Sequence, residues 1–350
     1  MTISAPLLQN FAQSLLRAAD VSQPKAALVA HSLVAANLRG VDSHGVQLLP
    51  FYLEQFAVKN IDIHTDGDVS SENGACLTYN GKNGIGQWIS QICCAHAVRL
   101  AKVNGISIVV ARESNHFGAA AYWAQQMSAT GLIGITMCNA SPLVAPWQGK
   151  ETRFGTNPIC MSVPGPDCWL LDMATTTVAL GKIIHAMNHG RAEIPAGWAM
   201  DKEGVPTANT ETALNGLLMP LGGYKGSGLA MLVEILCAVL SGGAMSSQLG
   251  ALRAPGEPMR VGQVFLAIDI LRFMPMETFV ERMRTLVALV KSSAPARGYD
   301  EVLVAGELEW RQQEQRSKQG IAVSPGVWQA LVEAAGQLHV AVPDGISAQL

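Results

Sequence analysis

Residues 105–118 read GISIVVARESNHFG, and this stretch decides the predicted class of fold. Its first half, residues 106–110, is a run of mostly β-branched apolar residues, which is typical of a buried strand. Polar residues follow where that strand would end, and a helix is predicted over 118–129. Polar side chains at the carboxyl end of a strand face the crevice in which open α/β sheets bind ligands. The stretch therefore predicts a strand, a ligand-facing loop and a helix in succession.

The rest of the chain repeats this alternation. Helices are predicted near the start, after Ser4 and Ser22 and over 43–59, and another short helix from about 322. Within 43–59, Pro50 must either begin the helix or kink it. Further strands are predicted at 132–138, 159–163, 169–173 and 264–268. Further helices are predicted at 86–103, 175–188, 227–240 and 276–291. Alternation of this kind predicts an α/β fold. We predict an α/β domain over 74–274 and a largely helical domain formed by 1–73 together with 275–350.

The composition excludes several classes of protein. The 350 residues are 49% hydrophobic and 15% charged, which provides a large core and argues against disorder. A formal net charge of -3 gives no field for holding nucleic acid. Neither a signal peptide nor a run of about 18 apolar residues is found, and the seven cysteines show no metal-ligand spacing. We expect a cytoplasmic protein with free thiols and no metal, membrane or nucleic-acid partner.

The glycine patterns of the usual nucleotide-binding motifs are incomplete. Residues 84–86 read GIG, but Ile89 occupies the third glycine position of a Rossmann fingerprint, and residues 226–228 read GSG with Met231 at that position. None of the three Gly-Lys pairs is followed by the Ser or Thr of a P-loop. The sequence therefore does not predict a conventional Rossmann or P-loop site.

Two histidines are candidates for proton transfer, because an imidazole can exchange a proton near neutral pH. If the chain is helical from Ser43 onward, His44, Leu48 and Tyr52 share one face, and the phenol could orient the ring or hold a substrate. The alternative is that Ser43 caps a helix and His44 is merely its first, half-exposed residue. His116 follows the strand quoted above and could donate a hydrogen bond to a substrate oxygen.

Two further polar residues lie in loops that follow strands. Asn115 could donate to a substrate together with His116, or it could cap the next helix. Thr156 lies in the turn-rich segment 155–158, for which a structural turn is the simpler interpretation.

Two segments are candidates for binding a cofactor. In 171–176, LDMATT, a strand ends in Asp172, which could accept from a ribose hydroxyl or could cap the following helix. In 222–228, GGYKGSG, the glycines allow close approach of a ligand, and Lys225 adds charge to the positive end of a helix. A flexible turn with a solvated lysine is the alternative.

Together these segments resemble the type-2 malate/L-lactate dehydrogenase family. Its relatives include ureidoglycolate, 2,3-diketogulonate and sulfolactate dehydrogenases and the piperideine-2-carboxylate reductases. Six stretches match in family order over nearly the whole chain: RGVDSHGVQLLPFY (39–52), GISIVVARESNHFG (105–118), GTNPI (155–159), LDMATT (171–176), IPAGWAMDKEGVPT (194–207) and GGYKGSGLAMLVEIL (222–236). Each motif is weak alone, but six in register make a specific signal.

The resemblance implies a non-Rossmann NAD(P)-binding fold with a central mixed sheet, a largely helical part built from the termini, and a homodimer. It implies that a hydride is transferred between a small 2-hydroxy or 2-oxo acid and a nicotinamide cofactor. The cofactor would be NAD or NADP, of which NAD is favoured. His44 would be the proton donor and acceptor and His116 a second catalytic residue, while the substrate would contact Ser43, Tyr52, Asn115 and Thr156. The dinucleotide would contact Cys168, Trp169, Leu170, Leu171, Asp172, Met173, Ala174, Tyr224, Lys225, Val304, Ala305, Gly306 and Glu307.

The sequence departs from the family pattern at three places. Relatives typically carry an arginine that grips the substrate carboxylate where this chain has Leu48, and Arg39, Arg112 and Arg153 are candidate replacements. The segment 304–307, VAGE, stands in place of a usual Pro-Gly-Glu. Ser141 replaces an aspartate of the ureidoglycolate enzymes, which counts against that substrate. Two alternatives therefore stay open, a reductase of cyclic imino acids and a catalytically silent dinucleotide-binding protein.

Overall fold

A mixed β-sheet forms the centre of the protein. The computed structural model describes residues 1–165, 169–254 and 256–343. In that part of the chain the sheet has seven strands in the order β2-β3-β4-β11-β5-β6-β7. They are β2 (Asp68–Asn73), β3 (Cys76–Asn80), β4 (Ile106–Ser114), β5 (Leu132–Cys138), β6 (Ile159–Ser162), β7 (Leu170–Met173) and β11 (Val261–Asp269). Only the β3–β4 pair is parallel among these described strands, which confirms the predicted mixed sheet.

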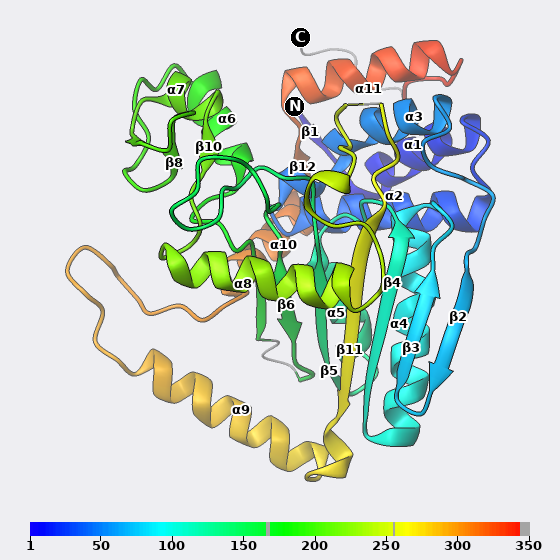
Figure 1. The fold of residues 1–350 in the computed structure, drawn as a ribbon, viewed down its shortest axis with the longest axis vertical. Coiled ribbons are helices and arrows are strands. Elements are labelled where there is room, and N and C mark those ends of the chain that lie inside the picture. Colours follow the sequence, from blue (N-terminus) through cyan, green and yellow to red (C-terminus); the bar gives the residue numbers. More distant parts are fainter. Residues whose placement is uncertain (166–168, 255, 344–350) are drawn as a thin grey trace.

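Helices cover both faces of this sheet. On one face lie α4 (Gly86–Asn104) and α5 (Ala120–Ser128), and on the other lies α8 (Tyr224–Glu234), which continues as the π-helical segment η3 (Ile235–Val239) (Figure 1). The central strand β11 shows why both faces are apolar. Its successive residues Val264 and Phe265 point to opposite faces, and both are fully buried. Strands buried on two sides need such continuous apolar runs.

The two ends of the chain form the helical part together. The helices are α1 (Ala5–Ala18), α2 (Gln23–Leu38), α3 (Leu49–Ala57) and α11 (Pro325–Gln337). The strand β1 (Thr2–Ile3) pairs with β12 (Ile321–Ala322), and the Phe11 ring packs against Trp328 with centroids 5.5 Å apart. The division predicted at residue 73 stays a prediction, and β2, which precedes it, lies in the central sheet.

A smaller lobe, not predicted from the sequence, has a core of its own. It contains α6 (Leu180–Asn188), β8 (Ala199–Met200), β9 (Pro206–Thr207), α7 (Thr210–Leu214) and β10 (Leu217–Leu218). The predicted helix over 175–188 begins only at Leu180. The N–H groups of Thr175 and Thr177 donate to the carbonyls of Thr156 and Met219, which holds the segment before this helix against neighbouring loops.

The predicted helix over 43–59 is interrupted. Two 3₁₀ turns, η1 (Asp42–His44) and η2 (Val46–Leu48), precede α3, and Gly45 between them is extended. Asn37 causes this break, since its Oδ1 accepts the Val46 N–H at 2.9 Å and a Cβ on Gly45 would lie 2.3 Å from that oxygen. The sequence placed His44 and Tyr52 on one face of a continuous helix from Ser43 onward. Because the helix is broken at Gly45, the two residues do not share a helix face.

Other elements lie at the edges of the protein. Two 3₁₀ turns, η4 (Ser246–Gln248) and η5 (Ile270–Arg272), flank β11. The helix α9 (Met276–Lys291) extends away from the sheet, and α10 (Glu307–Gln319) returns toward it (Figure 1). The sequence did not predict α10, because this helix has too few apolar residues to show a periodic pattern. In the described ranges, no helix combines the length and apolar character needed to cross a membrane.

Candidate active site

Two imidazoles from distant parts of the chain stack against each other. His44 ends η1, and His116 lies in the loop between β4 and α5. Their ring centroids are 5.7 Å apart, with 17° between the ring planes. Both side chains are half-buried, so part of each ring is accessible from solvent. The fold thus brings together the two histidines that the sequence singled out.

The surroundings of His116 fix its tautomer. Its Nδ1 lies 2.6 Å from the Tyr52 hydroxyl and 3.2 Å from the backbone nitrogen of Gly118. A backbone N–H can only donate, so Nδ1 must accept and the proton of the neutral ring lies on Nε2. Desolvation, followed by the influence of His44 and Arg253, lowers the pKa of His116 to about 3. At neutral pH, His116 is therefore an uncharged hydrogen-bond donor.

The surroundings of His44 allow both protonation states. Its Nδ1 lies 3.0 Å from the Ser43 hydroxyl, which can either donate or accept. Desolvation, and secondarily the charge of Arg253, lowers the pKa of His44 to about 4. An anionic ligand would raise this pKa, because a nearby negative charge favours the protonated ring. His44 can therefore change its protonation state without losing its hydrogen-bond partner.

Tyr52 orients His116 rather than His44, which corrects one of the two roles suggested for it from the sequence. The side chain is buried, and desolvation raises the pKa of its hydroxyl well above the usual range. It therefore stays a phenol that donates to His116. The break at Gly45 explains the difference, since it turns His44 away from the register of α3.

The other predicted substrate residues lie around this pair. Asn115 is fully buried, and its Nδ2 donates to the backbone carbonyls of Asn83 and Gly84. It does not cap α5, whose N-cap is Ala119. The backbone carbonyl of Thr156 accepts from the backbone N–H and the hydroxyl of Thr175. Contacts of Ser43, Tyr52, Asn115 and Thr156 with a substrate stay predictions.

The segments predicted to bind a cofactor meet along β7 and the residues after it. The Leu170 N–H donates to the Ala305 carbonyl at 3.2 Å, and Asp172 Oδ2 accepts from the Ala121 N–H at 3.0 Å. The Thr175 carbonyl accepts from the Leu221 N–H at 2.9 Å, just before α8. Strand β7 thus touches the 304–307 segment, the start of α5 and, through the residues that follow it, the start of α8.

This line of segments also reaches the imidazoles. The start of α6 lies beside Ser43, since a Cβ on Gly181 would be 3.7 Å from the Ser43 Cβ. Of the remaining predicted cofactor residues, Cys168 lies outside the described residues. The Glu307 carboxylate is occupied by Lys291 and Arg311, at 2.5 and 2.6 Å. That ion pairing indicates a structural contribution from Glu307 at the start of α10.

The residues along this line fit a dinucleotide. Asp172 is exposed, and its carboxylate is an acceptor of the kind that ribose hydroxyls need. Gly306 has φ +90°, and a Cβ there would lie 2.9 Å from the Leu170 carbonyl. Tyr224 and Lys225 are exposed at the positive end of α8, where phosphates bind favourably.

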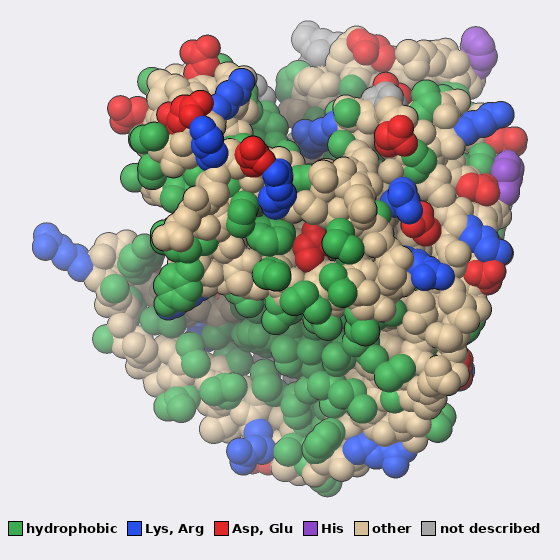
Figure 2. Space-filling view, in the orientation of Figure 1, with side chains coloured by type: hydrophobic (Ala, Val, Ile, Leu, Met, Phe, Trp, Pro, Cys, Tyr) green, Lys and Arg blue, Asp and Glu red, His purple; other side chains and the backbone are tan. Residues whose placement is uncertain are grey.

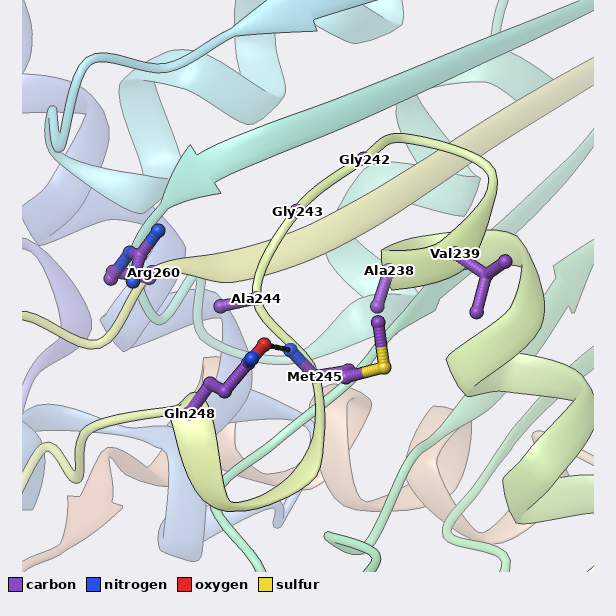
Figure 3. A pocket seen from close by; sticks show the side chains of 8 residues that line it. All are labelled: Ala238, Val239, Gly242, Gly243, Ala244, Met245, Gln248 and Arg260. Carbon is purple, nitrogen blue, oxygen red and sulfur yellow. Dashed lines mark hydrogen bonds between the residues drawn. The ribbon is translucent and has the colours of Figure 1, made fainter.

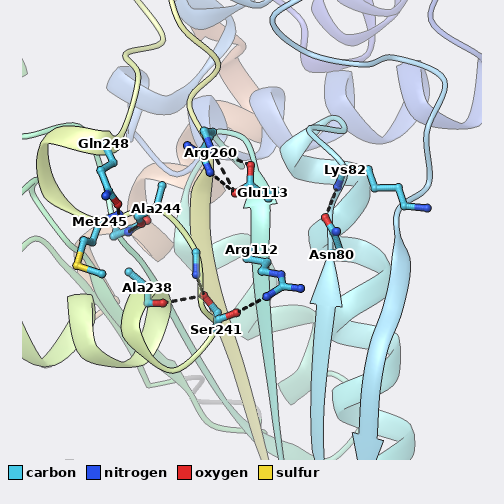
Figure 4. A network of polar contacts seen from close by, with 12 residues as sticks. Asn80, Lys82, Arg112, Glu113, Ala238, Ser241, Ala244, Met245, Gln248 and Arg260 are labelled. Atoms are coloured by element: carbon cyan, nitrogen blue, oxygen red, sulfur yellow. Dashed lines mark hydrogen bonds and ion pairs between the residues drawn. The ribbon is translucent and has the colours of Figure 1, made fainter.

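A separate cavity of about 430 Å³ lies beside η3, and it is lined by residues of η3, the following loop and η4 and by Arg260, which directly precedes β11 (Figure 3). Its cation, Arg260, forms a bidentate ion pair with Glu113, and the neighbouring Arg112 donates to the Ser241 carbonyl (Figure 4). Both guanidinium groups are engaged by the protein itself. We therefore place the candidate active site at the imidazoles and not at this cavity.

Comparison with known proteins identifies the family. The family model described as malate/L-lactate dehydrogenase matches residues 3–332. The chain belongs to the malate/L-lactate dehydrogenase family. It is accordingly an oxidoreductase of the 1.1.1 type, a hydroxy-acid dehydrogenase that uses a nicotinamide dinucleotide. The resemblance inferred from six sequence motifs is confirmed.

Individual members of the malate/L-lactate dehydrogenase family match over nearly their whole length. A malate dehydrogenase from Pyrococcus horikoshii is 37% identical over 342 residues, which cover 95% of this chain and 94% of that protein. The structure of sulfolactate dehydrogenase from Methanocaldococcus jannaschii has a TM-score of 0.91 at 33% identity, covering 97% and 98% of the two chains. That of delta1-piperideine-2-carboxylate reductase from Pseudomonas syringae pvar. tomato has a TM-score of 0.83 at 27% identity, covering 96% and 100%.

Two residues near the imidazoles were missed by sequence reasoning. Gly118 contributes its backbone N–H to His116, and Arg253 contributes its charge to both rings. Gly118 lay within a recognised motif, and its φ of +79° is a typical reason for glycine after a functional loop. Arg253 lies in no motif, and its neighbourhood depends on how the chain before β11 packs onto α3.

Proposed function

We propose that this protein transfers a hydride reversibly between NAD and a small 2-oxo acid, with His44 as the proton donor and acceptor. The observation that carries the proposal is the stacked pair of imidazoles whose Nδ1 atoms have unlike partners. One ring is fixed as a donor and the other can change protonation state. Such a pair suits a carbonyl oxygen that becomes a hydroxyl.

The two rings divide the work. His116 donates from Nε2 to the substrate oxygen, and it cannot take a second proton while Nδ1 accepts from Gly118. His44 gives a proton to that oxygen during reduction and takes it back during oxidation, while Ser43 adjusts its hydroxyl. The substrate carboxylate and the charge growing on the oxygen raise the pKa of His44 from its low value in the free protein. Positioned proton transfer contributes about 10²–10⁴-fold.

The dinucleotide would be held by β7 and the segments that meet it. The exposed Asp172 carboxylate would accept from ribose hydroxyls, and Lys225 would lie near the phosphates. A carboxylate at the ribose would repel a 2′-phosphate, which favours NAD over NADP. When bound, the nicotinamide supplies or accepts the hydride at C2 of the acid. We propose no metal in this reaction.

A panel assay tests the proposed function. Purified protein is mixed with NADH or NADPH and with pyruvate, oxaloacetate, 3-sulfopyruvate or Δ1-piperideine-2-carboxylate, and absorbance at the nicotinamide band is followed. We expect turnover with at least one 2-oxo acid and a lower KM for NADH than for NADPH. Tight dinucleotide binding without turnover of any compound would instead favour the catalytically silent alternative.

A second candidate reaction is reduction of a cyclic imino acid. It is favoured by the likeness to the Pseudomonas syringae reductase over 96% of this chain. An imine nitrogen is protonated more easily than a carbonyl oxygen, so weak acids at the site would suffice. A kcat/KM for the piperideine carboxylate at least tenfold above that for every 2-oxo acid would establish this reaction as the main one.

We also propose a homodimer that works in the cytoplasm. Exposed apolar side chains lie along α8 and η3 and directly after them: Met231, Leu232, Ile235, Val239 and Leu240. Figure 2 shows hydrophobic side chains continuing over the neighbouring surface. An apolar area of this kind usually marks an interface. Light scattering on the eluting protein should give twice the chain mass of 37.1 kDa. A monomer at micromolar concentration would contradict the dimer.

A further inference from the structure

The proposed substrate carries a carboxylate, and the two imidazoles do not supply a positive charge to hold it. Both rings are neutral at pH 7 in the free protein. Leu48 is only 3% exposed and packs into the hydrophobic core, so it offers no polar group either. A cation from another element must therefore bind the carboxylate if the proposed function is correct.

The side chain of Arg253 packs against α3. Its guanidinium carbon lies over the Phe51 ring, 5.2 Å from the centroid. Phe51 directly precedes Tyr52, whose hydroxyl contacts His116. An arginine stacked on an aromatic ring is partly preorganised, because the stacking restricts its side chain.

The backbone just before Arg253 is fixed to the same helix. The buried Gln55 donates its Nε2 to the carbonyls of Ala251 and Leu252, at 3.3 and 2.9 Å. Leu252 is itself buried in the main core. Backbone anchoring combined with an exposed side chain suits a group that must reach a ligand.

The charge of Arg253 acts on both catalytic rings. It lowers the pKa of His44 and of His116, and Coulomb interactions of this kind weaken with distance. Among the described residues Arg253 has no carboxylate partner, so its positive charge is available to a ligand.

The three arginines considered from the sequence are placed differently. Arg112 donates to the Ser241 carbonyl, and Arg153 pairs with Glu151. Arg39 is buried, and its charge acts on Asp172 and Cys160, which lie on the cofactor side. Of these four arginines, Arg253 is the one whose charge acts on both imidazoles.

We infer that Arg253 binds the substrate carboxylate, as a two-pronged donor that reaches over Phe51 toward the stacked imidazoles. The guanidinium fork matches a carboxylate in geometry and charge. This inference rests on the proposed function for the identity of the ligand. The cation comes from the chain before β11, whereas the resemblance placed it at position 48.

Binding of oxalate tests this inference without requiring turnover. Oxalate is titrated calorimetrically into wild type, Arg253→Gln and Arg99→Gln, each with saturating NADH. Arg99 is a matched control, because it is an exposed arginine on α4 paired with Glu72 of β2. We expect Arg253→Gln to weaken oxalate binding about 10- to 100-fold, as for a lost hydrogen bond to a charged group, and Arg99→Gln to change it less than twofold. Equal affinities of Arg253→Gln and wild type, or no oxalate binding by wild type, would overturn the inference.

A comparison of charged and uncharged substrates separates binding from structure. For pyruvate, kcat/KM should fall about 10- to 100-fold in Arg253→Gln, mainly through KM, and Arg253→Lys should recover part of the loss. For methyl pyruvate, which lacks the charge, the change should be less than threefold. Equal losses on both compounds would show that Arg253 acts structurally and overturn the inference. If wild type turns over no 2-oxo acid, the proposed function fails, and the oxalate titration still decides the role of Arg253.

Discussion

His44 and His116 differ chiefly in the partners of their Nδ1 atoms. A hydroxyl faces Nδ1 of His44, whereas a backbone N–H and a phenol face Nδ1 of His116. The sequence identified both histidines and their possible chemistry. It could not assign their roles, because the decisive partners of His116 come from α3 and from the turn at Gly118, whose positions depend on the fold.

The tautomer of His116 is a direct prediction at this scale. Two-bond proton–nitrogen spectra of histidine-labelled protein should show Nδ1 without a proton and Nε2 with one from pH 8 down to pH 5, because the pKa of His116 is lowered to about 3. A His116→Gln sample assigns the signal. A His116 signal that titrates near pH 6.5, or that carries its proton on Nδ1, would refute the division of roles.

At the scale of elements, the sequence predicted those with a strong apolar period and missed those without one. The helix α4 and the strand β5 were predicted nearly residue for residue. The polar helix α10 and the exposed strand β2 have too few apolar residues to show a pattern. The helix predicted over 43–59 begins only at Leu49, with Pro50 in its first turn, which is one of the two places that the sequence allowed for this proline. Residues 42–48 form two 3₁₀ turns instead, and the sequence did not predict them because Asn37, which breaks the helix, belongs to the preceding one.

Two glycines of α8 should respond oppositely to alanine. A Cβ on Gly226 would lie 2.3 Å from the Leu221 nitrogen and 2.7 Å from the Thr175 carbonyl, whereas a Cβ on Gly228 would meet nothing within 4 Å. We expect Gly226→Ala to reduce the free energy of unfolding by about 1–3 kcal/mol, because the start of α8 must shift. Gly228→Ala should leave it unchanged or raise it by up to about 1 kcal/mol.

Urea unfolding of both variants checks this pair. Since α8 begins beside the segment after β7, Gly226→Ala should also weaken NADH binding, and Gly228 serves as the matched control. Equal stability of the two variants would mean that the contact between α8 and Thr175 is looser than described.

At the scale of the whole molecule, the active site makes stability depend on pH. The pKa values of His44 and His116 are lowered from 6.5 to about 4 and about 3 in the folded protein. Below pH 6.5 the unfolded chain therefore binds protons that the folded state excludes. The stability contributed by the neutral rings is complete above about pH 6.5 and is lost as the pH falls toward their folded values.

This linkage predicts a smaller acid effect in a histidine variant. Between pH 7.5 and pH 5, His116→Gln should lose less unfolding free energy than wild type, by as much as about 2 kcal/mol. Denaturant titrations of both proteins at the two pH values measure the difference, and His339→Gln, at a surface position, is a control expected to behave like wild type. Parallel losses in wild type and His116→Gln would mean that the ring is not kept neutral by the fold.

The most direct test of the catalytic pair is the turnover of His44→Gln on the best 2-oxo acid at pH 7. Glutamine keeps a polar side chain of similar reach but has no group that binds or releases a proton near neutral pH. We predict that kcat/KM falls about 10²–10⁴-fold while NADH affinity and the circular dichroism spectrum stay those of wild type. A folded variant whose kcat/KM lies within threefold of the wild-type value would contradict the assignment of proton transfer to His44.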